Sequence, residues 1–365
     1  MVVLMLPHWK RASLVAAMLF LLTATTCSQA PEPPTRKASE SPIQKATQTG
    51  RHVAIPSANY AGVAWLRPDT IFISLLPDSE SLRTELWSVR LNGSDFVQVP
   101  IDDPECARED IHALTRLPDR RIGFIEFCMK NPNFAIPNTD GIFLSAVDPA
   151  NGRVERLMNE PLGFNGHQFT WNPQLTEGFA STLSDLCGSV AGLNREGLIY
   201  RSISVEDAGS TWDLADFFLD SGEHCDDYGR ADWPAWSSDG ASVAFFASAP
   251  QTEGSAFDRV NLPWSIFVMS ARDLEPRKVL GGILHPRGLS WSIDGRLAFS
   301  GTVASHGIGT WTFDPDSGEL AQVSSALISW LDWSPEGTKI AAISNVGPPA
   351  QPEDTLLIFD ATPAT

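Results

Sequence analysis

The chain has 365 residues, of which 43% are hydrophobic and 19% charged, and its 44 acidic against 26 basic residues give a net charge of −18. This balance argues against nucleic acid as a partner, because phosphate binding needs a basic face, and against a protein that lies flat on anionic lipid. An acidic, solvated surface that keeps the protein soluble accounts for the charge without any partner.

Residues 1–26 are predicted to be an export signal. Lys10 and Arg11 form a basic start, and the run from Leu14 to Leu22 that follows is apolar. That run is shorter than the roughly 20 apolar residues of a membrane-spanning helix, and its length is typical of a leader peptide. We therefore expect the rest of the chain to be extracytoplasmic.

Cys27 is predicted to carry a lipid anchor to the cell membrane or the outer membrane. The residues before it resemble the signal of bacterial lipoproteins, although Ala24 and Thr26 depart from the usual residues at their positions. Two alternatives stay open. One is ordinary cleavage after Ala30, which Pro31 disfavours because proline after the cut blocks the common signal peptidase. The other is an uncleaved anchor in which Cys27 is incidental.

Residues 27–50 are predicted to be a disordered tether. They are rich in Ser, Pro, Thr, Gln and Lys and contain almost no large apolar side chain. Such a segment cannot bury enough apolar surface to fold. The tether would hold the folded part away from a membrane surface.

One hairpin phrase recurs along the rest of the chain. Each copy has a residue at a fixed place, here called the slot residue, then a short turn and an apolar run. In the last three copies the turn contains Asp-Gly or Glu-Gly, as a tight turn with a positive φ requires. The copies span 62–75, 113–127, 169–182, 234–248, 289–301 and 331–344. Their slot residues are Trp65, Arg116, Trp171, Trp236, Trp291 and Trp333.

The period of the phrase predicts the architecture. Repeats roughly 40–65 residues apart indicate a propeller or an array. A third apolar strand follows each hairpin, at ELWSVRL, GIFLSAV, GLIYRSI, WSIFVMS, GTWTFD and DTLLIFD, and material for a fourth follows the first five. We therefore expect an all-β, six-bladed β-propeller over 51–365 with four-stranded antiparallel blades.

The sixth unit lacks a fourth strand of its own. Residues 52–56 lie before the first slot residue and are otherwise unassigned, so we expect them to supply that strand and close the ring, which removes an open sheet edge. The alternative is a β-sandwich with chance similarity among its hairpins. It does not explain why a third strand follows every hairpin.

The third unit carries an insertion at 210–232. The apolar residues between Trp212 and Leu219 fit one face of a helix, and the remainder is acidic. The functional interpretations are a lid, a partner-docking surface or a calcium loop, although the spacing is not that of an EF-hand. An acidic elaboration packed on the third blade is the structural alternative.

Four cysteines are predicted to form two disulfides on one face of the propeller. An even number in an oxidising compartment favours pairing, and the repeat places all four in loops that open on the same face. Of three possible pairings we expect Cys106–Cys128 and Cys187–Cys225. The spacing is not that of a metal finger, so we expect no metal and no cofactor.

The phrases WSSDG at 236–240, WSIDG at 291–295 and WSPEG at 333–337 resemble the β-propeller repeat of the TolB family. They are also similar to the propeller half of prolyl-oligopeptidase-type enzymes. The resemblance covers nearly all of 52–360 and is strong in the last three copies. It implies the propeller fold and says little about activity, because such repeats serve unrelated functions. GxSxG, HExxH, SxxK and Walker-type motifs do not occur, and we expect no hydrolase domain.

A ring of polar residues is predicted at the mouth of the propeller channel. The residue four places before each slot residue lies where a loop enters the innermost strand. These positions hold Ala61, His112, His167, Asp232, Arg287 and Ser329. Converging polar groups in a concave place suit a ligand site, and Trp330 and Asp332 are expected nearby. The alternative is a water-filled channel whose side chains satisfy neighbouring backbone groups. The tryptophans in the slots are expected to pack blades rather than stack on carbohydrate.

Three functions remain open on the sequence. The first, which we favour, is a monomeric, membrane-anchored binding or scaffold module that holds a protein, peptide or glycan of the cell envelope. The second is a glycan-active hydrolase or lyase at the channel mouth, using His112, His167 and Asp232. The third is a structural envelope component. The absence of a catalytic motif makes us lean against an enzyme.

Overall fold

The computed structural model describes residues 50–53, 55, 59–76, 84–101, 108–129, 141–158, 166–182, 190–194, 197–199, 204–207, 210–213, 230–249, 262–304, 306–345 and 354–361. This part of the chain is all β and contains no helix. The described residues therefore include no helix that is long and apolar enough to cross a membrane.

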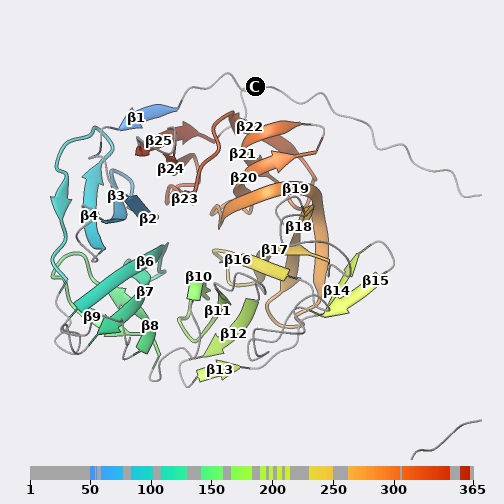
Figure 1. The fold of residues 1–365 in the computed structure, drawn as a ribbon, viewed down its shortest axis with the longest axis horizontal. Helices are drawn as coiled ribbons and strands as arrows, with labels where there is room; N and C mark the ends of the chain where they lie inside the picture. Colours follow the sequence, from blue (N-terminus) through green and yellow to red (C-terminus); the bar gives the residue numbers. More distant parts are fainter. Residues whose placement is uncertain are drawn as a thin grey trace, which may run out of the picture. The chain divides into compact units, whose positions relative to one another are not determined.

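Three four-stranded antiparallel sheets come first along the chain (Figure 1). The first has β2 (Asn59–Arg67), β3 (Thr70–Leu76), β4 (Glu85–Arg90) and β5 (Val97–Gln98), the second has β6 (Arg108–Arg116), β7 (Ile122–Met129), β8 (Gly141–Val147) and β9 (Val154–Arg156), and the third has β10 (Gly166–Trp171), β11 (Glu177–Thr182), β12 (Val190–Asn194) and β13 (Gly197–Ile199). In each sheet the strands lie in chain order, so every connection is a simple hairpin.

A seven-stranded sheet follows, in which one long strand joins two such units. Its members are β16 (Arg230–Trp236), β17 (Ser242–Ser248), β18 (Trp264–Ser270), β19 (Pro276–Trp291), β20 (Leu297–Val303), β21 (Gly307–Phe313) and β22 (Leu320–Ser324). The first half of β19 pairs with β18 and the second half with β20. The register shifts between Leu284 and Arg287, where His285 has a positive φ of 51°. This bulge bends β19 from the outer edge of one unit to the inner edge of the next.

The last sheet combines the two ends of the described chain. It has the order β1 (Arg51–Val53), β25 (Asp354–Asp360), β24 (Lys339–Asn345) and β23 (Trp330–Trp333). β1 runs antiparallel to β25, with Arg51 opposite Ile358 and Val53 opposite Leu356. The strand expected at 52–56 is thus found at Arg51–Val53, and Val53 is buried in the core.

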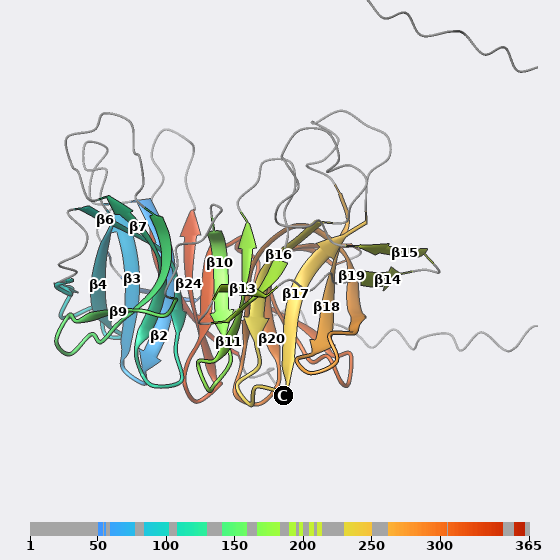
Figure 2. The same ribbon diagram turned by 90° about the horizontal axis from the view of Figure 1, so that it is seen from below.

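The sheets are arranged around a common centre, with one strand of each unit innermost (Figure 1). β2 contacts β6 and β23, β10 contacts β6 and β16, and β19 contacts β16 and β23. Figure 2 shows the strands from the side. Four-stranded antiparallel sheets set radially make a β-propeller, so the predicted fold class is confirmed at this level.

The core lies between neighbouring four-stranded units rather than in one central mass. Five of the six buried apolar clusters combine residues of two sheets, and the sixth lies between the two units of the seven-stranded sheet. Five of them contain a slot tryptophan, and all five indoles are buried, which agrees with a packing role. The cluster between the first and second sheets has none, because the slot residue of the second sheet is Arg116.

The hairpin turns show why the Trp-Ser-x-Asp-Gly phrase recurs. The Ser237 hydroxyl donates to Asp239 at 2.6 Å and accepts the N–H of Ser242 at 2.9 Å. Ser292 makes the same contacts with Asp294 and with the N–H of Arg296. Gly240 follows with a φ of 75°, a conformation that favours glycine.

Two expectations from the sequence are wrong. The third strand of the third sheet is β12 (Val190–Asn194), and the segment GLIYRSI contributes the fourth strand, β13. The error arose because β12 is short and contains a glycine, which weakens its strand signal. In the insertion, Ser210–Asp213 is not helical but forms β15, paired with β14 (Ser204–Asp207). The rest of the predicted helical face lies outside the described residues.

Candidate functional site

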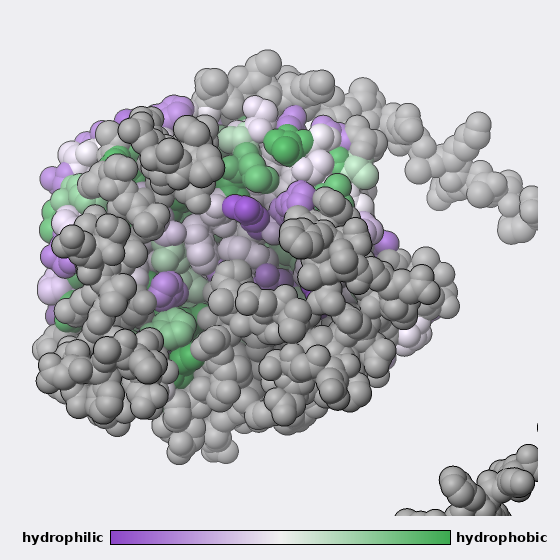
Figure 3. Space-filling view, in the orientation of Figure 1, coloured by the Kyte–Doolittle hydropathy of each residue, from purple (hydrophilic) through white to green (hydrophobic). Residues whose placement is uncertain are grey.

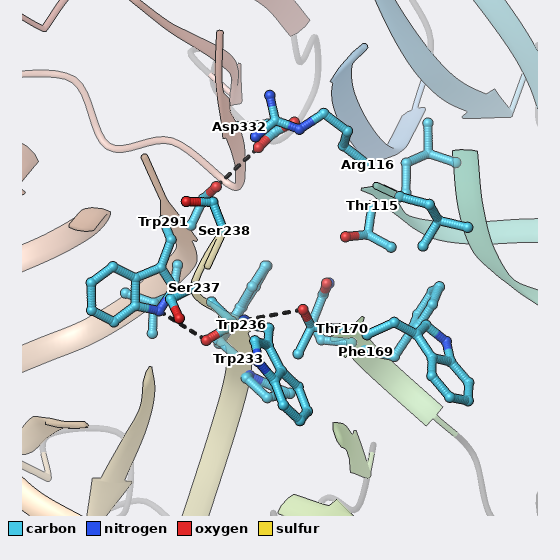
Figure 4. A pocket seen from close by; sticks show the side chains of 18 of the residues that line it. Thr115, Arg116, Phe169, Thr170, Trp233, Trp236, Ser237, Ser238, Trp291 and Asp332 are labelled. Carbon is cyan, nitrogen blue, oxygen red and sulfur yellow. Dashed lines mark hydrogen bonds between the residues drawn. The ribbon is translucent and has the colours of Figure 1, made fainter. Parts of the chain in front are cut away.

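A cavity of about 190 Å³ lies where the innermost strands converge (Figure 4). Its walls come from β2, β6, β10, β16, β19 and β23, together with the hairpin turns that follow several of them. Figure 3, which looks along the same axis as Figure 1, shows hydrophilic and hydrophobic residues side by side in the middle of this face. A concave place lined by several units of a repeat is the usual kind of ligand site.

The residue just before each slot residue gives the cavity much of its polar lining. These residues are Ala64, Thr115, Thr170, Ala235, Ser290 and Asp332, and all but Ala64 line the cavity. Thr170 accepts the slot N–H of Trp236 at 3.1 Å, and Asp332 accepts the slot N–H of Trp65 at 2.8 Å. In both cases a side-chain oxygen of one sheet holds the backbone of the next. These polar side chains therefore fasten neighbouring blades as well as facing the cavity.

Asp332 is the buried charge of the site. Its Oδ2 accepts the Trp65 N–H, and its Oδ1 accepts the Ser290 hydroxyl at 2.9 Å and the Trp333 N–H at 2.9 Å. Burial raises the pKa of Asp332, and the positive charge of Arg116 and these hydrogen bonds oppose that rise. A carboxylate with a perturbed pKa in a cavity is a frequent mark of a functional site.

Arg116 points toward Asp332 from the other side of the cavity (Figure 4). It occupies the slot of the second sheet, where the other sheets place a tryptophan between blades. Its guanidinium makes no hydrogen bond or ion pair of 4.0 Å or less with any other described residue. The exchange of tryptophan for arginine thus brings a positive charge into the lining.

Two tryptophans add an aromatic wall. The rings of Trp233 and Trp330 meet edge to face, with centroids 5.2 Å apart, and both residues are half-buried. They belong to β16 and β23, which lie on different sheets. Neither is a slot residue, and both line the cavity while packing against the edges of the apolar clusters between blades.

The predicted mouth residues do not line this cavity. Arg287 donates to the Ser329 hydroxyl at 3.1 Å, so these two are brought together across two sheets. Asp232 accepts the N–H of the adjacent Trp233 at 2.7 Å, and His112 meets the ring of Phe127 edge to face, with centroids 5.2 Å apart.

The fourth polar member, His167, lies in β10, and its side chain is outside what the structure describes. Ala61 lies in β2. The mouth site as a whole stays a prediction.

A bulge explains why the cavity starts farther along the strands. In β6, β16 and β19 the register shifts between the predicted mouth residue and the residue just before the slot or its neighbour. The residue at the shift has a left-handed φ in each strand, 53° at Ala113, 55° at Trp233 and 56° at Gly288. A bulge adds one residue and re-aims those around it. The in-and-out alternation of side chains along a strand is therefore interrupted between the slot residue and the mouth residue, so counting back from the slot does not predict which way the mouth residue faces.

The sequence reasoning missed the hydroxyl positions one place before the slot, and it treated Arg116 only as a weak copy of the repeat. The available signal was the polar character of Thr115, Thr170, Ser290 and Asp332 at one repeat position. Among the described residues, no group of three or more His, Cys, Asp or Glu side chains is placed to hold a metal ion. Of the cysteines, Cys128 is fully buried, and Cys27, Cys106, Cys187 and Cys225 lie outside the described residues.

Comparison with known proteins supports the fold and goes no further. No protein-family model matches the chain. No curated protein matches its sequence either. TolB from Acinetobacter baumannii is similar in structure, with a TM-score of 0.50 and 12% identity over 80% of this chain, and the chain spans 64% of that protein.

Two enzymes are similar to a comparable degree. The PQQ-bound aldose sugar dehydrogenase of Streptomyces coelicolor has a TM-score of 0.50 and 11% identity, covering 87% of this chain and 99% of that one. A gluconolactonase of Xanthomonas campestris has a TM-score of 0.48 and 16% identity, covering 88% and 97%. At such identities only the fold is shared, and the fold serves binding proteins and enzymes alike.

Proposed function

We propose that this protein is an extracytoplasmic binding module, anchored by a lipid on Cys27, whose channel recognises a protein, peptide or glycan of the cell envelope. The observation that carries the proposal is the convergence of Arg116, Asp332 and the hydroxyls of Thr115, Thr170 and Ser290 on one cavity. The carboxylate of Asp332 already accepts three hydrogen bonds, two of which come from neighbouring blades.

The partner is expected at the mouth of the channel, where Asp232 and Arg287 lie on neighbouring innermost strands, with the 210–232 insertion leading into β16. The test is capture of envelope components by the tagged protein from detergent-solubilised membranes. Asp232→Arg combined with Arg287→Glu should abolish capture while the melting temperature stays close to that of the wild type. Capture that persists in this double variant contradicts the proposed surface.

A matched control uses the opposite ends of the strands. Glu336 and Arg67 are exposed and lie at hairpin turns. Glu336→Arg combined with Arg67→Glu makes the same two charge reversals there and should leave capture intact. If this control loses capture and the mouth variant keeps it, the recognition face is the hairpin side.

A second candidate is a glycan-active hydrolase or lyase, and the raised pKa of Asp332 favours it, because a general acid needs a carboxyl that stays protonated at higher pH. Release of reducing ends from envelope glycans should then fall by about 10²–10⁴ in Asp332→Asn. The binding module predicts no turnover in the wild type and no change in this variant.

We further propose that the propeller has six blades closed by β1. Support comes from the pairing of β1 with β25 and from the contacts that link the six innermost strands in sequence. For the disulfides we keep Cys106–Cys128 and Cys187–Cys225. The strand neighbour of Cys128 across the register is Glu109, three residues after Cys106, which supports the first of these pairings.

A further inference from the structure

Two slot tryptophans donate their indole N–H to the neighbouring unit, and two others lack an acceptor in the part of the chain that the structure describes. Trp291 donates its indole N–H to the carbonyl of Ala235 at 2.9 Å, and Trp333 donates to the carbonyl of Ser290 at 3.1 Å. In both cases the acceptor is the residue before the slot of the preceding unit, whereas Trp65 donates to the carbonyl of Arg67 in its own strand at 2.8 Å. Trp171 and Trp236 have no such acceptor among the described residues, although they are only 5% and 8% exposed.

The same side of the ring holds two further donors without a partner. Gln168 is 8% exposed, lines the cavity, and its Nε2 has no hydrogen-bond partner among the described residues. Arg116 fills the neighbouring slot, and its guanidinium offers five N–H donors in a planar fork. These four residues belong to β6, β10 and β16, three consecutive innermost strands, and all four line the cavity.

The described lining of the cavity therefore lacks hydrogen-bond acceptors for these buried donors. Each buried lining side chain that lacks a partner within the described part of the chain presents an N–H. Two of the lining acceptors are already engaged: Asp332 accepts three hydrogen bonds and the Thr170 oxygen accepts one. A buried N–H without an acceptor costs about 1–3 kcal/mol. A molecule that brings oxygen acceptors would remove this cost.

We propose that the cavity binds a small organic acid, whose carboxylate lies on Arg116 and Gln168 and whose further oxygen atoms accept from the indoles of Trp171 and Trp236. Asp332 leaves the Arg116 guanidinium available, because its own three hydrogen-bond donors already engage its carboxylate. An arginine fork matches a carboxylate with two parallel hydrogen bonds. The carbon skeleton would rest on the edge-to-face pair of Trp233 and Trp330.

The size of the cavity limits the ligand. At about 190 Å³ it far exceeds the about 10–15 Å³ that one water molecule needs. It is smaller than the about 300 Å³ at which pockets for drug-sized molecules begin. The inference thus goes beyond the proposed function, since the ligand is a small molecule inside the channel rather than a macromolecule at its mouth.

The test uses the full chain with three acids, pyruvate, succinate and glucuronate, each titrated separately, and glucose as the uncharged control. We expect millimolar or tighter binding of at least one acid and none of glucose. In ¹⁵N-labelled protein the indole N–H signals of Trp171 and Trp236 should shift, because they gain acceptors. Those of Trp65, Trp291 and Trp333 should not, because they already donate to carbonyls.

Variants decide whether these contacts carry the binding. Arg116→Gln should weaken the acid about tenfold to a hundredfold, as expected for a lost charged hydrogen bond, and Gln168→Leu about threefold to tenfold. Arg277→Gln, an exposed arginine on β19, is the charge control and should bind as the wild type does. If no acid binds the wild type, or if Arg116→Gln and Gln168→Leu both bind unchanged, the inference is wrong.

Partner capture measured on the same variants separates the two proposals. If Arg116→Gln loses acid binding but still captures the partner, the acid site and the partner surface are independent sites and both proposals stand. Wild-type protein that captures its partner but binds no acid overturns the inference alone.

Discussion

At the scale of single residues, Asp332 both lines the candidate site and stabilises the fold. Asp332→Ala would leave the buried N–H of Trp65 without its acceptor and Arg116 without its opposing charge, so we expect a loss of about 3 kcal/mol in the free energy of unfolding. Thr170→Val removes the equivalent neutral contact to Trp236 and should cost about 1 kcal/mol. Urea unfolding measures both, and equal losses would contradict a special role for the buried charge.

The pH dependence of stability follows from the direction of two pKa shifts. Burial raises the pKa of Asp332, so its ionised form is disfavoured in the folded state, and this penalty fades as the pH falls toward its ordinary value of 3.8. The Ser237 hydroxyl lowers the pKa of Asp239, so its contribution is present above 3.8 and is lost as the pH falls further through the lowered folded value.

Unfolding free energies of the wild type, Asp332→Asn and Asp239→Asn from neutral pH downward test these signs. On acidification the wild type should gain stability relative to Asp332→Asn and lose stability relative to Asp239→Asn. If the wild type gains stability, or loses it, relative to both variants on acidification, the direction given for one of the two pKa shifts is wrong.

At the scale of elements, β1 gives the clearest test. Val53 is buried at the junction of the first and last sheets, whereas His52 beside it is exposed. Val53→Asp places a charge in that core and should lower the unfolding free energy by at least about 2 kcal/mol, with a drop of several degrees in the melting temperature. His52→Asp introduces the same side chain one residue away and should change it by less than about 0.5 kcal/mol.

If Val53→Asp melts like His52→Asp, β1 does not support the last sheet and the closure that we propose is wrong. Deletion of 51–53 should have the same effect as Val53→Asp or a larger one, because it also exposes the edge of β25.

At the scale of the whole molecule, the anchoring prediction concerns where the propeller resides. Cys27→Ser should release the protein into the aqueous phase of a detergent partition or leave it unprocessed, since the thiol that would carry the lipid is gone. Cys106→Ser is the control and should partition as the wild type does. Wild-type protein that is wholly aqueous, with Pro31 at its N-terminus, contradicts the anchor.

The sequence by itself determined the repeat and hence the radial four-stranded architecture. Slot residues, Asp-Gly turns and alternating apolar runs are local signals, because each hairpin is specified by its own turn and its own buried face. For that reason β17, β20 and β24 lie where the phrase predicts them. The short, glycine-containing β12 carried too weak a signal to be placed.

Only the tertiary structure decided which polar residues share a cavity. Arg116 and Asp332 are far apart in the chain and line the same cavity because their strands converge on the common centre. The bulges at Ala113 and Trp233 are stabilised by pairing across the sheet, and nothing in those residues themselves requires a positive φ. Likewise, an indole N–H lacks an acceptor only because of how the neighbouring blade is placed. Non-local contacts of this kind are what the sequence of one strand cannot specify.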